Sequence, residues 1–363
     1  MGTRQGPLQG FPRLHLGFFP TPLERLGTLG ARLGHEALYI KRDDLTGLSL
    51  GGNKARSLEF LLGDAVKLGA DTIVTAGGLQ SNLCSLTAAA CAKAGLKCVL
   101  VHNDLPPAGF HGNMLLNRLF GAESLFIGRK SEEERATAVD EVARDLRAGG
   151  GRPYVIHSGA STPIGALGYV EAAREVLEQC RTLHVPLRHV AIVGAMGGTA
   201  SGFVFGTALL GHPFHVHVIS VEYAAEELRR RMFSLLSGLR ELTGLMPAVP
   251  PDEAMTIYDD YLGGGYAVPT PGSTRMLRDL PRLEGIFVEN VYTAKALAGL
   301  VGLIERGIIR RSEPACFVHT GGMAALFAQH LDRSGLLKSS CPHKTPHSRH
   351  IMLRRLTKRC SRC

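Results

Sequence analysis

The chain alternates between short, strongly apolar runs and longer stretches in which apolar residues recur every three or four positions. The short runs are β-rich and predict strands, whereas the longer stretches predict helices. The predicted strands are residues 38–41, 72–75, 98–101, 124–127, 154–156, 189–193, 215–219 and 315–319. The predicted helices between them are residues 54–68, 82–94, 111–119, 131–147, 162–180, 199–210, 223–236 and 292–306. This alternation is typical of parallel sheets covered by helices on both faces, so the predicted fold class is α/β.

Size and hydropathy narrow the class of protein. The 363 residues correspond to about two domains of ordinary size. The most apolar stretch, LTAAACAKAGLKCVLV, is interrupted by Lys93 and Lys97, whereas a membrane-spanning helix needs about 20 apolar residues in a row. The first residues, MGTRQGPLQGFPR, lack the apolar core of a secretory signal. We therefore expect a cytoplasmic protein that does not bind a membrane.

The net charge of +9 comes from one end of the chain. Residues 338–363 hold eight Lys or Arg and no Asp or Glu, which leaves 33 basic and 32 acidic residues before them. This tail suits a nucleic-acid arm or, through Cys360 and Cys363, a metal site. A disordered tail without either role is the interpretation we favour, so neither nucleic acid nor metal is expected. The other cysteines read as core thiols in a reducing compartment: Cys84, Cys91, Cys98, Cys180 and Cys316.

Three glycine-rich turns lie where a predicted strand gives way to a helix. The first, Gly51–Arg56, carries Lys54 at the start of a helix. The positive end of the helix dipole and the flanking Arg56 both favour the neutral form of the Lys54 amine. A neutral amine can form a Schiff base. From local chemistry alone, a solvated lysine at a helix terminus is the interpretation we favour.

The second and third turns offer anion sites. In Gly77–Asn82 the backbone N–H groups and the following helix suit a carboxylate or phosphate, although Ser81 and Asn82 are also ordinary N-cap residues. Gly194–Gly202 suits a phosphate, with the Thr199 hydroxyl as a further donor. Its alternatives are a dinucleotide-binding turn, for which the GxGxxG spacing is absent, and a turn without ligand. An amine, a phosphate cradle and a carboxylate site are together the parts that a pyridoxal phosphate enzyme needs.

Five segments resemble, in order, the motifs of one family. They are YIKRDDLTGLSLGGNKARSLEF, TAGGLQSN, GAMGGTASG, VYTAKALAGL and FVHTGG. The family is that of the fold-type II pyridoxal phosphate enzymes that include D-cysteine desulfhydrases and 1-aminocyclopropane-1-carboxylate deaminases. The resemblance runs from about Pro20 to about Ala328, and its most specific motif is GGNKxRxLEF.

The resemblance implies a role for each matched residue. Lys54 resembles the lysine that holds pyridoxal 5'-phosphate through a Schiff base, and Asn82 the residue that hydrogen-bonds the pyridine 3-hydroxyl oxygen. Ser81 resembles the hydroxyl near the substrate carboxylate and the proton-transfer path. Tyr292 and Tyr266 match two active-site tyrosines, although without the resemblance both would read as packed or loop aromatics. The other matched positions are Ala195, Met196, Gly197, Gly198 and Thr199 in the phosphate loop, Thr320 near the pyridine nitrogen, Asn53 beside the cofactor, and Gln80 and Leu83 beside the substrate.

The chain departs from the family pattern at two positions. Leu83 stands where histidine is frequent, which removes one polar contact to the substrate, and Met196 stands where a small residue is usual. A third position separates branches of the family. Thr293 follows the first active-site tyrosine, where deaminases of the cyclopropane amino acid tend to carry glutamate, so it resembles the desulfhydrase branch.

The implied protein is a two-domain fold-type II enzyme, similar to the β subunit of tryptophan synthase, and a homodimer. Residues 1–52 and 163–337 would form the large domain and residues 53–162 the small one, with the cofactor in the cleft between them. The implied reaction is an α,β-elimination of a small amino acid, with D-cysteine giving pyruvate, ammonia and hydrogen sulfide. The alternatives are a 1-aminocyclopropane-1-carboxylate deaminase, an L-cysteate sulfo-lyase, or a relative that binds the cofactor without catalysis.

Overall fold

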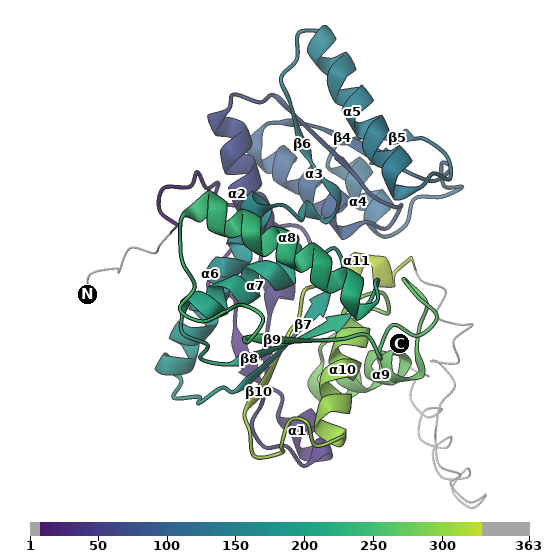
Figure 1. Cartoon of the computed structure of the whole chain (residues 1–363). Coiled ribbons are helices and arrows are strands. Elements are labelled where there is room, and N and C mark those ends of the chain that lie inside the picture. The colour runs from purple at the N-terminus through teal and green to yellow at the C-terminus, as the bar shows by residue number, and fades with distance from the viewer. Residues whose placement is uncertain (1–7, 329–363) are drawn as a thin grey trace, which may run out of the picture. The chain divides into compact units, whose positions relative to one another are not determined.

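The structure of the protein is a computed structural model that describes residues 8–328. Its strands form two sheets (Figure 1). Every strand predicted from the sequence is present, with each end within one residue of its expected position. The α/β fold class is confirmed.

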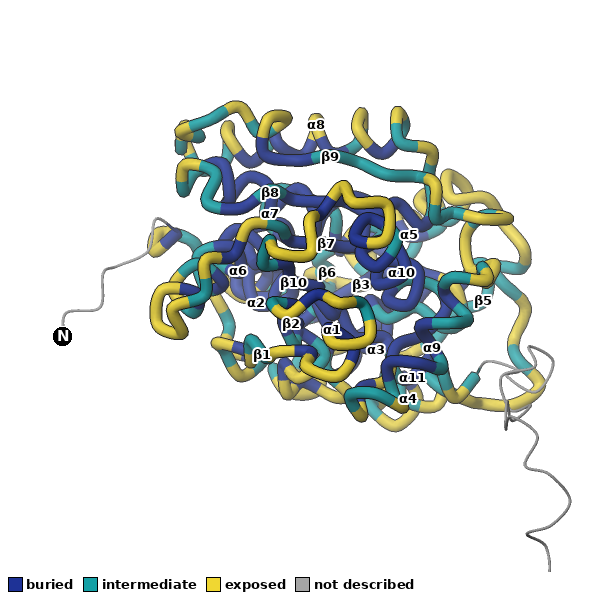
Figure 2. The backbone as a smooth tube through the Cα atoms, turned by 90° about the horizontal axis from the view of Figure 1, so that it is seen from below, coloured by how far each residue is buried: buried dark blue, intermediate teal, exposed yellow. Residues whose placement is uncertain are grey.

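The larger sheet has six strands in the order β1-β2-β10-β7-β8-β9. All neighbours are parallel except β1 and β2, which run antiparallel. The central strands β10, β7 and β8 are buried along nearly their whole length (Figure 2), because helices cover both faces. The six strands are β1 (Leu23–Arg25), β2 (Leu38–Lys41), β7 (His189–Gly194), β8 (His215–Ser220), β9 (Met255–Tyr258) and β10 (Ala315–Val318).

The smaller sheet has four parallel strands in the order β5-β4-β3-β6. These strands are β3 (Thr72–Ala76), β4 (Lys97–His102), β5 (Glu123–Phe126) and β6 (Pro153–Ile156). The helices that precede or connect them are α2 (Lys54–Lys67), α3 (Asn82–Ala94), α4 (Asn113–Leu119) and α5 (Glu132–Ala148). Since all four strands are parallel, their carboxyl ends meet at one edge of the sheet.

Helix α7 (Gly198–Leu209) is buried almost throughout and packs closely against α6 (Pro163–Thr182). This contact needs a glycine at position 202, because a Cβ atom there would lie 2.1 Å from the Ala166 carbonyl oxygen. The remaining helices of the larger sheet are α1 (Gly27–Leu33), α8 (Ala225–Thr243), α9 (Pro271–Glu284), α10 (Thr293–Glu305) and α11 (Met323–Leu326). Short 3-10 helices span Asp43–Leu45 and Ser158–Ala160.

The predicted helices differ from the structure mainly in α8 and α9. Helix α8 was expected to end at residue 236, but it continues through Gly238, which packs against Pro163. Helix α9 was missed because it contains two prolines, Pro271 in its first turn and Pro281 inside it. A capping box between Thr270 and Ser273 starts this helix. The short elements β1, α1, β9 and α11 were also missed.

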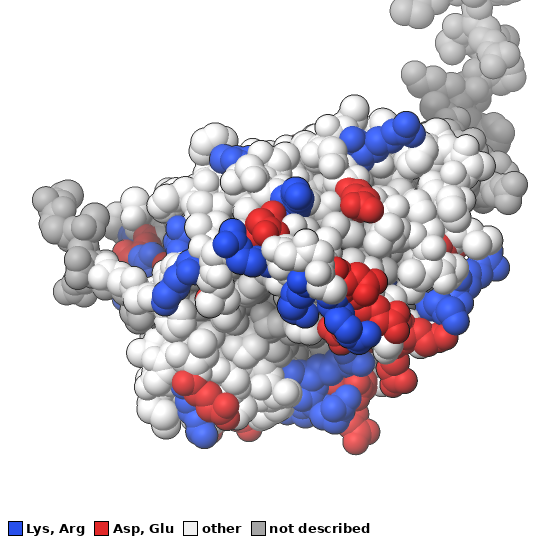
Figure 3. Space-filling model, turned by 90° about the horizontal axis from the view of Figure 1, so that it is seen from above, with Lys and Arg blue, Asp and Glu red and all other residues white. Residues whose placement is uncertain are grey.

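The remaining expectations on the chain have different outcomes. Cys84, Cys91, Cys98, Cys180 and Cys316 are free and buried, as predicted. Within residues 8–328, no helix is long and apolar enough to cross a membrane. On the face seen in Figure 3, basic and acidic side chains stand next to one another. The division into a large and a small domain stays a prediction, and the basic tail, residues 338–363, lies outside the described residues.

Candidate active site

One cavity of about 490 Å³ lies at the carboxyl ends of strands from both sheets. From the smaller sheet it is lined by the turn after β3, by Asn103 after β4 and by Ser158 after β6. From the larger sheet it is lined by the turn after β7, by Glu222 after β8 and by Thr320 after β10. The carboxyl edges of parallel sheets are where α/β proteins bind ligands. The cavity brings together Asn53, Lys54, Gln80, Ser81, Asn82, Leu83, Ala195, Met196, Gly197, Gly198, Thr199, Tyr266, Tyr292 and Thr320, which are all of the predicted site residues.

Lys54 is the first residue of α2 and its amine is buried. The amine donates a hydrogen bond to the Gly159 carbonyl oxygen at 2.7 Å. Burial lowers the pKa of Lys54 to about 8, against the opposing effect of the Glu222 carboxylate. The expectation that Arg56 contributes to this shift is wrong, because Asp43 and Glu175 neutralise the Arg56 guanidinium. A buried lysine with a lowered pKa suits Schiff-base chemistry.

The turn after β7 leads directly into the N-terminus of α7, which has no side-chain cap. Gly197 adopts φ +96°, which favours glycine, and a Cβ at Gly198 would lie 2.8 Å from the Ser161 hydroxyl. The Gly198 N–H donates to that hydroxyl at 3.1 Å, and the Asn53 amide donates to the Thr199 hydroxyl at 2.8 Å. An uncapped helix N-terminus with hydroxyl groups around it suits a phosphate.

Met196 lies in the same turn, and its side chain contacts Tyr223 and the 3-10 helix Ser158–Ala160. The Tyr223 hydroxyl lies 3.3 Å from the Met196 sulfur. Met196 also packs against the 3-10 helix that follows β6, since a Cβ at Gly159 would lie 2.9 Å from Met196 Cβ. The large side chain is thus accommodated while the turn keeps its uncapped helix end.

The turn after β3 is fixed by α4. The Gln80 side chain accepts a hydrogen bond from the Asn113 N–H at 2.9 Å, and Asn82 Oδ1 accepts one from the Asn113 amide at 2.8 Å. The second bond orients the Asn82 amide so that its NH₂ group is the donor available to a ligand. Ser81 caps α3 by accepting the Cys84 N–H at 3.2 Å. Leu83, in the first turn of α3, adds only apolar surface to the cavity.

Two tyrosines from distant parts of the chain meet in the cavity. The hydroxyl groups of Tyr266 and Tyr292 are hydrogen-bonded, and their rings meet edge to face with centroids 5.8 Å apart. Burial raises the pKa of both hydroxyls, so both are protonated at neutral pH. A pair of coupled hydroxyls can pass a proton toward a reacting atom.

Glu289 positions Tyr292, a role that the sequence did not suggest. Its buried carboxylate accepts the backbone N–H groups of Val291, Tyr292 and Thr293 at 2.7, 2.9 and 2.9 Å. The Thr293 hydroxyl also donates to Glu289 at 3.1 Å. Burial raises the pKa of Glu289, and these donors oppose the rise. Thr293 therefore supports the start of α10 rather than lining the cavity.

The cavity also contains charged residues that were not predicted: Glu132, Arg135 and Glu222. Burial raises the pKa of Glu222, and the charge of Glu132 adds to the rise. Asn103 and Ser158 hydrogen-bond the Arg135 guanidinium at 3.0 and 3.1 Å. Glu132 and Arg135 belong to the stretch EEER, which is indistinguishable in sequence from a solvated helix face.

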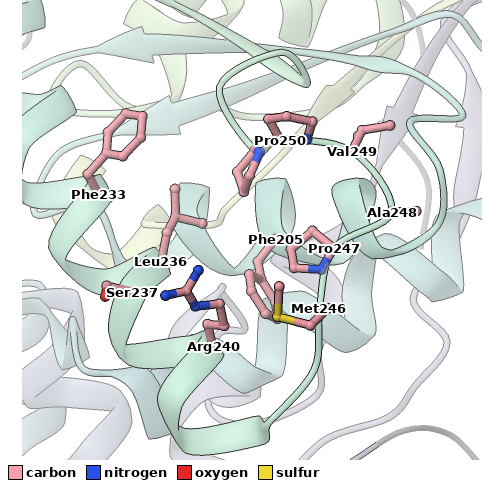
Figure 4. A pocket seen from close by; sticks show the side chains of 11 residues that line it. Phe205, Phe233, Leu236, Ser237, Arg240, Met246, Pro247, Ala248, Val249 and Pro250 are labelled. Atoms are coloured by element: carbon pink, nitrogen blue, oxygen red, sulfur yellow. The ribbon is translucent and has the colours of Figure 1, made fainter.

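A second cavity, of about 440 Å³, holds none of the predicted site residues (Figure 4). It lies between α7, α8 and the loop before β9. Its wall is mostly apolar, with Phe205, Leu236 and Met246, and Arg240 is its charged side chain. It lacks the amine and the uncapped helix end of the first cavity, so we place the candidate active site in the first.

Comparison with known proteins identifies the family. The model of the family described as pyridoxal-phosphate dependent enzymes matches residues 14–321. The chain belongs to this family. The chain is 40% identical to a D-cysteine desulfhydrase of Yersinia enterocolitica, over 90% of this chain and 99% of the relative. A D-cysteine desulfhydrase of Salmonella choleraesuis is 38% identical, over 89% of this chain and 98% of the relative.

Solved structures of this enzyme family agree in fold. A structure described as an ACC deaminase homologue has a TM-score of 0.83 and 34% identity, covering 91% of this chain and 98% of the other. An O-ureido-L-serine synthase has a TM-score of 0.64 at 18% identity, covering 91% and 95%, and supports the fold alone. The predicted fold-type II family and its cofactor, pyridoxal phosphate, are therefore confirmed. The cavity fits this cofactor, because it offers a buried amine for the aldehyde and an uncapped helix end for the phosphate.

Proposed function

We propose that this pyridoxal phosphate enzyme catalyses the α,β-elimination of D-cysteine. D-Cysteine and water would give pyruvate, ammonia and hydrogen sulfide. The observation that carries the proposal is the identity of 40% and 38% to two D-cysteine desulfhydrases over almost their whole length. The cavity supports it with a buried amine, an anion site and two coupled hydroxyls in one place.

In this proposal Lys54 binds the cofactor. The turn Ala195–Thr199 and Asn53 hold its phosphate, while Asn82 and Thr320 hold its ring. Gln80, Ser81, Asn82 and Leu83 face the substrate. The uncapped start of α7, the Asn53–Thr199 hydrogen bond and the orientation of the Asn82 amide support these roles.

The chemistry divides between the cofactor and the chain. When bound, the cofactor supplies an electron sink for the charge left on Cα after its proton is removed. The Lys54 amine, with its pKa near 8, is suited to take and return that proton close to neutral pH. Ser81 lines the same cavity and would belong to the proton path, and the protonated Tyr266–Tyr292 pair would supply a proton to the departing sulfur.

The second candidate activity is that of a 1-aminocyclopropane-1-carboxylate deaminase. The solved structure described as an ACC deaminase homologue, at a TM-score of 0.83, favours it. Thr293 argues for the first candidate, because the carboxyl group that deaminases tend to carry after the tyrosine is replaced here by a hydroxyl that faces Glu289.

A substrate panel tests the proposal. Pyruvate and sulfide are measured with D- and L-cysteine, pyruvate with D-serine and L-cysteate, and ammonia with the cyclopropane amino acid. We expect D-cysteine to be the best substrate. Turnover of the cyclopropane amino acid alone would support the second candidate, and turnover of L-cysteate alone a sulfo-lyase. A protein that binds the cofactor but turns over none of these compounds would contradict the elimination altogether.

We also propose a cytoplasmic homodimer. The five free, buried thiols of the described residues support a reducing compartment. The exposed apolar surface around the second cavity, which includes Met246 and Phe233, is suited to contact a second copy (Figure 4). Light scattering on the purified protein measures the number of chains, and a monomeric mass would refute the dimer.

A further inference from the structure

Arg135 lies in the first turns of α5 and lines the active-site cavity. Its guanidinium donates to two neutral oxygens, Asn103 Oδ1 at 3.0 Å and Ser158 Oγ at 3.1 Å. Its Nε atom is buried and has no hydrogen-bond partner among residues 8–328. Arg135 is thus a partly desolvated cation whose donors are incompletely used.

Two acidic residues near Arg135 are engaged elsewhere, and a third, Glu222, lines the same cavity without an ion pair to Arg135 among residues 8–328, although the charge of Arg135 opposes the rise in the pKa of Glu222. On the same helix, Glu134 pairs with Lys130 at 2.7 Å, and Glu132 lies 3.9 Å from Arg231. A buried charge without a countercharge is costly, so such groups usually mark the place where a ligand supplies the missing charge. The unmet charge of Arg135 therefore points to an anionic ligand.

The sheet order shows where the guanidinium lies. Asn103 follows β4 and Ser158 follows β6, and β3 pairs with both of these strands. A guanidinium that reaches both residues must therefore cross the carboxyl end of β3, where Gly77 begins the turn to Ser81. Position 77 needs glycine, because a Cβ there would lie 2.4 Å from the Ser81 hydroxyl.

The turn that Arg135 covers is itself suited to an anion. Asn82 and Leu83 are the first residues of α3, where backbone N–H groups have no partner within the helix and can bind an anion. The charge of Arg135 acts on Cys84 in the first turn of α3, where it opposes the rise in pKa that burial causes at the thiol. It also opposes the rise in pKa that burial causes at Tyr266 across the cavity. The Arg135 guanidinium and the N-terminus of α3 can therefore act together on an anion in the cavity.

We infer that Arg135 binds the α-carboxylate of the substrate, together with the turn Gly77–Ser81. An amino acid whose amine lies beside Lys54 carries one anionic group next to Cα, and Arg135 adds a full positive charge to the backbone donors that this group meets in the cavity. The inference rests on the proposed function only in that the substrate is an amino acid. It makes Arg135 a substrate-binding residue whatever leaves from Cβ.

The test compares two amines that differ only in a carboxylate. Alanine lacks a leaving group, and ethylamine is alanine without its carboxylate. Each is titrated into holoenzyme, and binding is followed by the change in visible absorption of the cofactor, with the alanine enantiomer that binds more tightly. In Arg135→Gln we expect alanine to bind about tenfold to a hundredfold more weakly, as for the loss of a charge-assisted hydrogen bond. Ethylamine binding should not change.

Two further variants complete the experiment. Arg147→Gln changes an exposed arginine at the other end of α5 and should bind both amines as the wild type does. Arg135→Lys keeps the charge but loses the planar fork, so its alanine affinity should fall between those of the wild type and Arg135→Gln. If Arg135→Gln does not fold, the alanine-to-ethylamine ratio of Arg135→Lys decides in the same way.

Three outcomes would overturn the inference. Unchanged alanine binding in Arg135→Gln would remove Arg135 from the carboxylate site. Equal weakening of alanine and ethylamine would show that it only shapes the cavity. Loss of L-cysteate binding with alanine unaffected would place it at a distal acidic group instead. Failure to form pyruvate from D-cysteine would refute the proposed function, and an Arg135-dependent alanine affinity would still support this inference.

Discussion

Two pairs of cations that are wholly or partly buried have opposite surroundings. Lys41 and Arg56 sit in a closed ionic cluster. The Lys41 amine is bonded to Glu175, to Gln179 at 2.7 Å and to the Thr21 carbonyl at 2.6 Å. Arg56 donates to Asp43 and Glu175 at 2.8 Å each. Every charge in this cluster has a countercharge within the protein.

Lys54 and Arg135 form the contrasting set. Their partners are a backbone carbonyl, an amide oxygen and a hydroxyl, all neutral. The pKa alone does not separate the two sets, because burial lowers the pKa of Lys41 as well as that of Lys54. The hydrogen-bond partners of the four cations do separate the two sets. We therefore expect the cations that the protein neutralises to hold the fold together, and those that it leaves without an ion pair at the cavity to bind ligands.

The largest expected effect is the loss of Lys54. In Lys54→Ala the cofactor cannot be attached covalently, so we expect no cofactor to be trapped by borohydride and turnover to fall by more than about 10⁴-fold. The melting temperature of the cofactor-free protein should change little, because the loss of the hydrogen bond to Gly159 is offset by the removal of a cation that is costly to bury. Lys67→Ala, at the far end of the same helix, is the control and should behave as the wild type.

A labelled peptide that lacks Lys54 would contradict this assignment. So would a visible absorption band that persists unchanged in Lys54→Ala. Either result would group Lys54 with Lys41 and Arg56 as a cation that stabilises the fold.

The next effect concerns the proton-transfer groups around Lys54. Tyr292→Phe and Ser81→Ala each remove one hydroxyl from the cavity, and the loss of a positioned acid or base typically costs about 10²- to 10⁴-fold in rate. We expect pyruvate formation to fall by that amount while the cofactor stays bound. Tyr261→Phe is the matched control, since its hydroxyl is bonded to Arg306 outside the cavity. Loss of the cofactor in either variant would show a holding role instead.

Substitutions in the cluster of Lys41 and Arg56 should lower stability and leave cofactor binding unchanged. Arg56→Met leaves Asp43 buried without its main partner, which costs about 3–5 kcal/mol in the free energy of unfolding. The change is measured by urea denaturation. The cofactor bound per folded molecule should stay the same. Arg181→Met breaks an exposed pair with Glu178 and should cost about 1 kcal/mol or less. Greater loss of turnover than of stability in Arg56→Met would undo the distinction between the two sets.

Sequence reasoning reached the local parts of the site. Lys54 and Thr199 lie in glycine-rich turns between a strand and a helix, so their positions are visible along the chain, whereas the role of Lys54 followed from the family resemblance. The positions of the strands are visible in the same way, because their apolar runs are short and distinct. The helix α9 was hidden because Pro271 and Pro281 signal a break, although the first stands at a helix start and the second is tolerated near the helix end.

The parts that escaped prediction depend on contacts between distant segments. Asn103 and Ser158 are 55 positions apart in the sequence, and only the order β4-β3-β6 brings both to Arg135. Arg135 itself follows three glutamates and has the appearance of a surface residue. Glu289 was missed because its function is to accept backbone N–H groups, for which no residue pattern was recognised.

The smallest effect comes from a third group of buried ionisable residues, at the opposite ends of the strands that carry the site. His189, at the amino end of β7, lies with its Nδ1 atom 3.0 Å from His217 Nε2 on β8, and His217 Nδ1 lies 3.1 Å from the Tyr258 hydroxyl. His189 also faces Glu313 at 3.3 Å. Burial lowers the pKa of His217 from 6.5 to about 3, and the neighbouring charges of His215 and His189 add to the shift. These histidines are therefore neutral in the folded protein.

The sign of the pH dependence follows from that shift. The unfolded chain takes up a proton at His217 below pH 6.5, and the folded protein does not until about pH 3. Stability is therefore full above pH 6.5 and falls as the pH decreases, by about 2 kcal/mol at pH 5 for His217 alone. In His217→Gln we expect the free energy of unfolding to fall less between pH 7.5 and pH 5 than in the wild type, by about this amount. His157→Gln, at an exposed position, should keep the wild-type slope. Equal slopes in all three proteins would show that His217 is not held neutral, and that a buried group can lack a countercharge here without any energetic consequence.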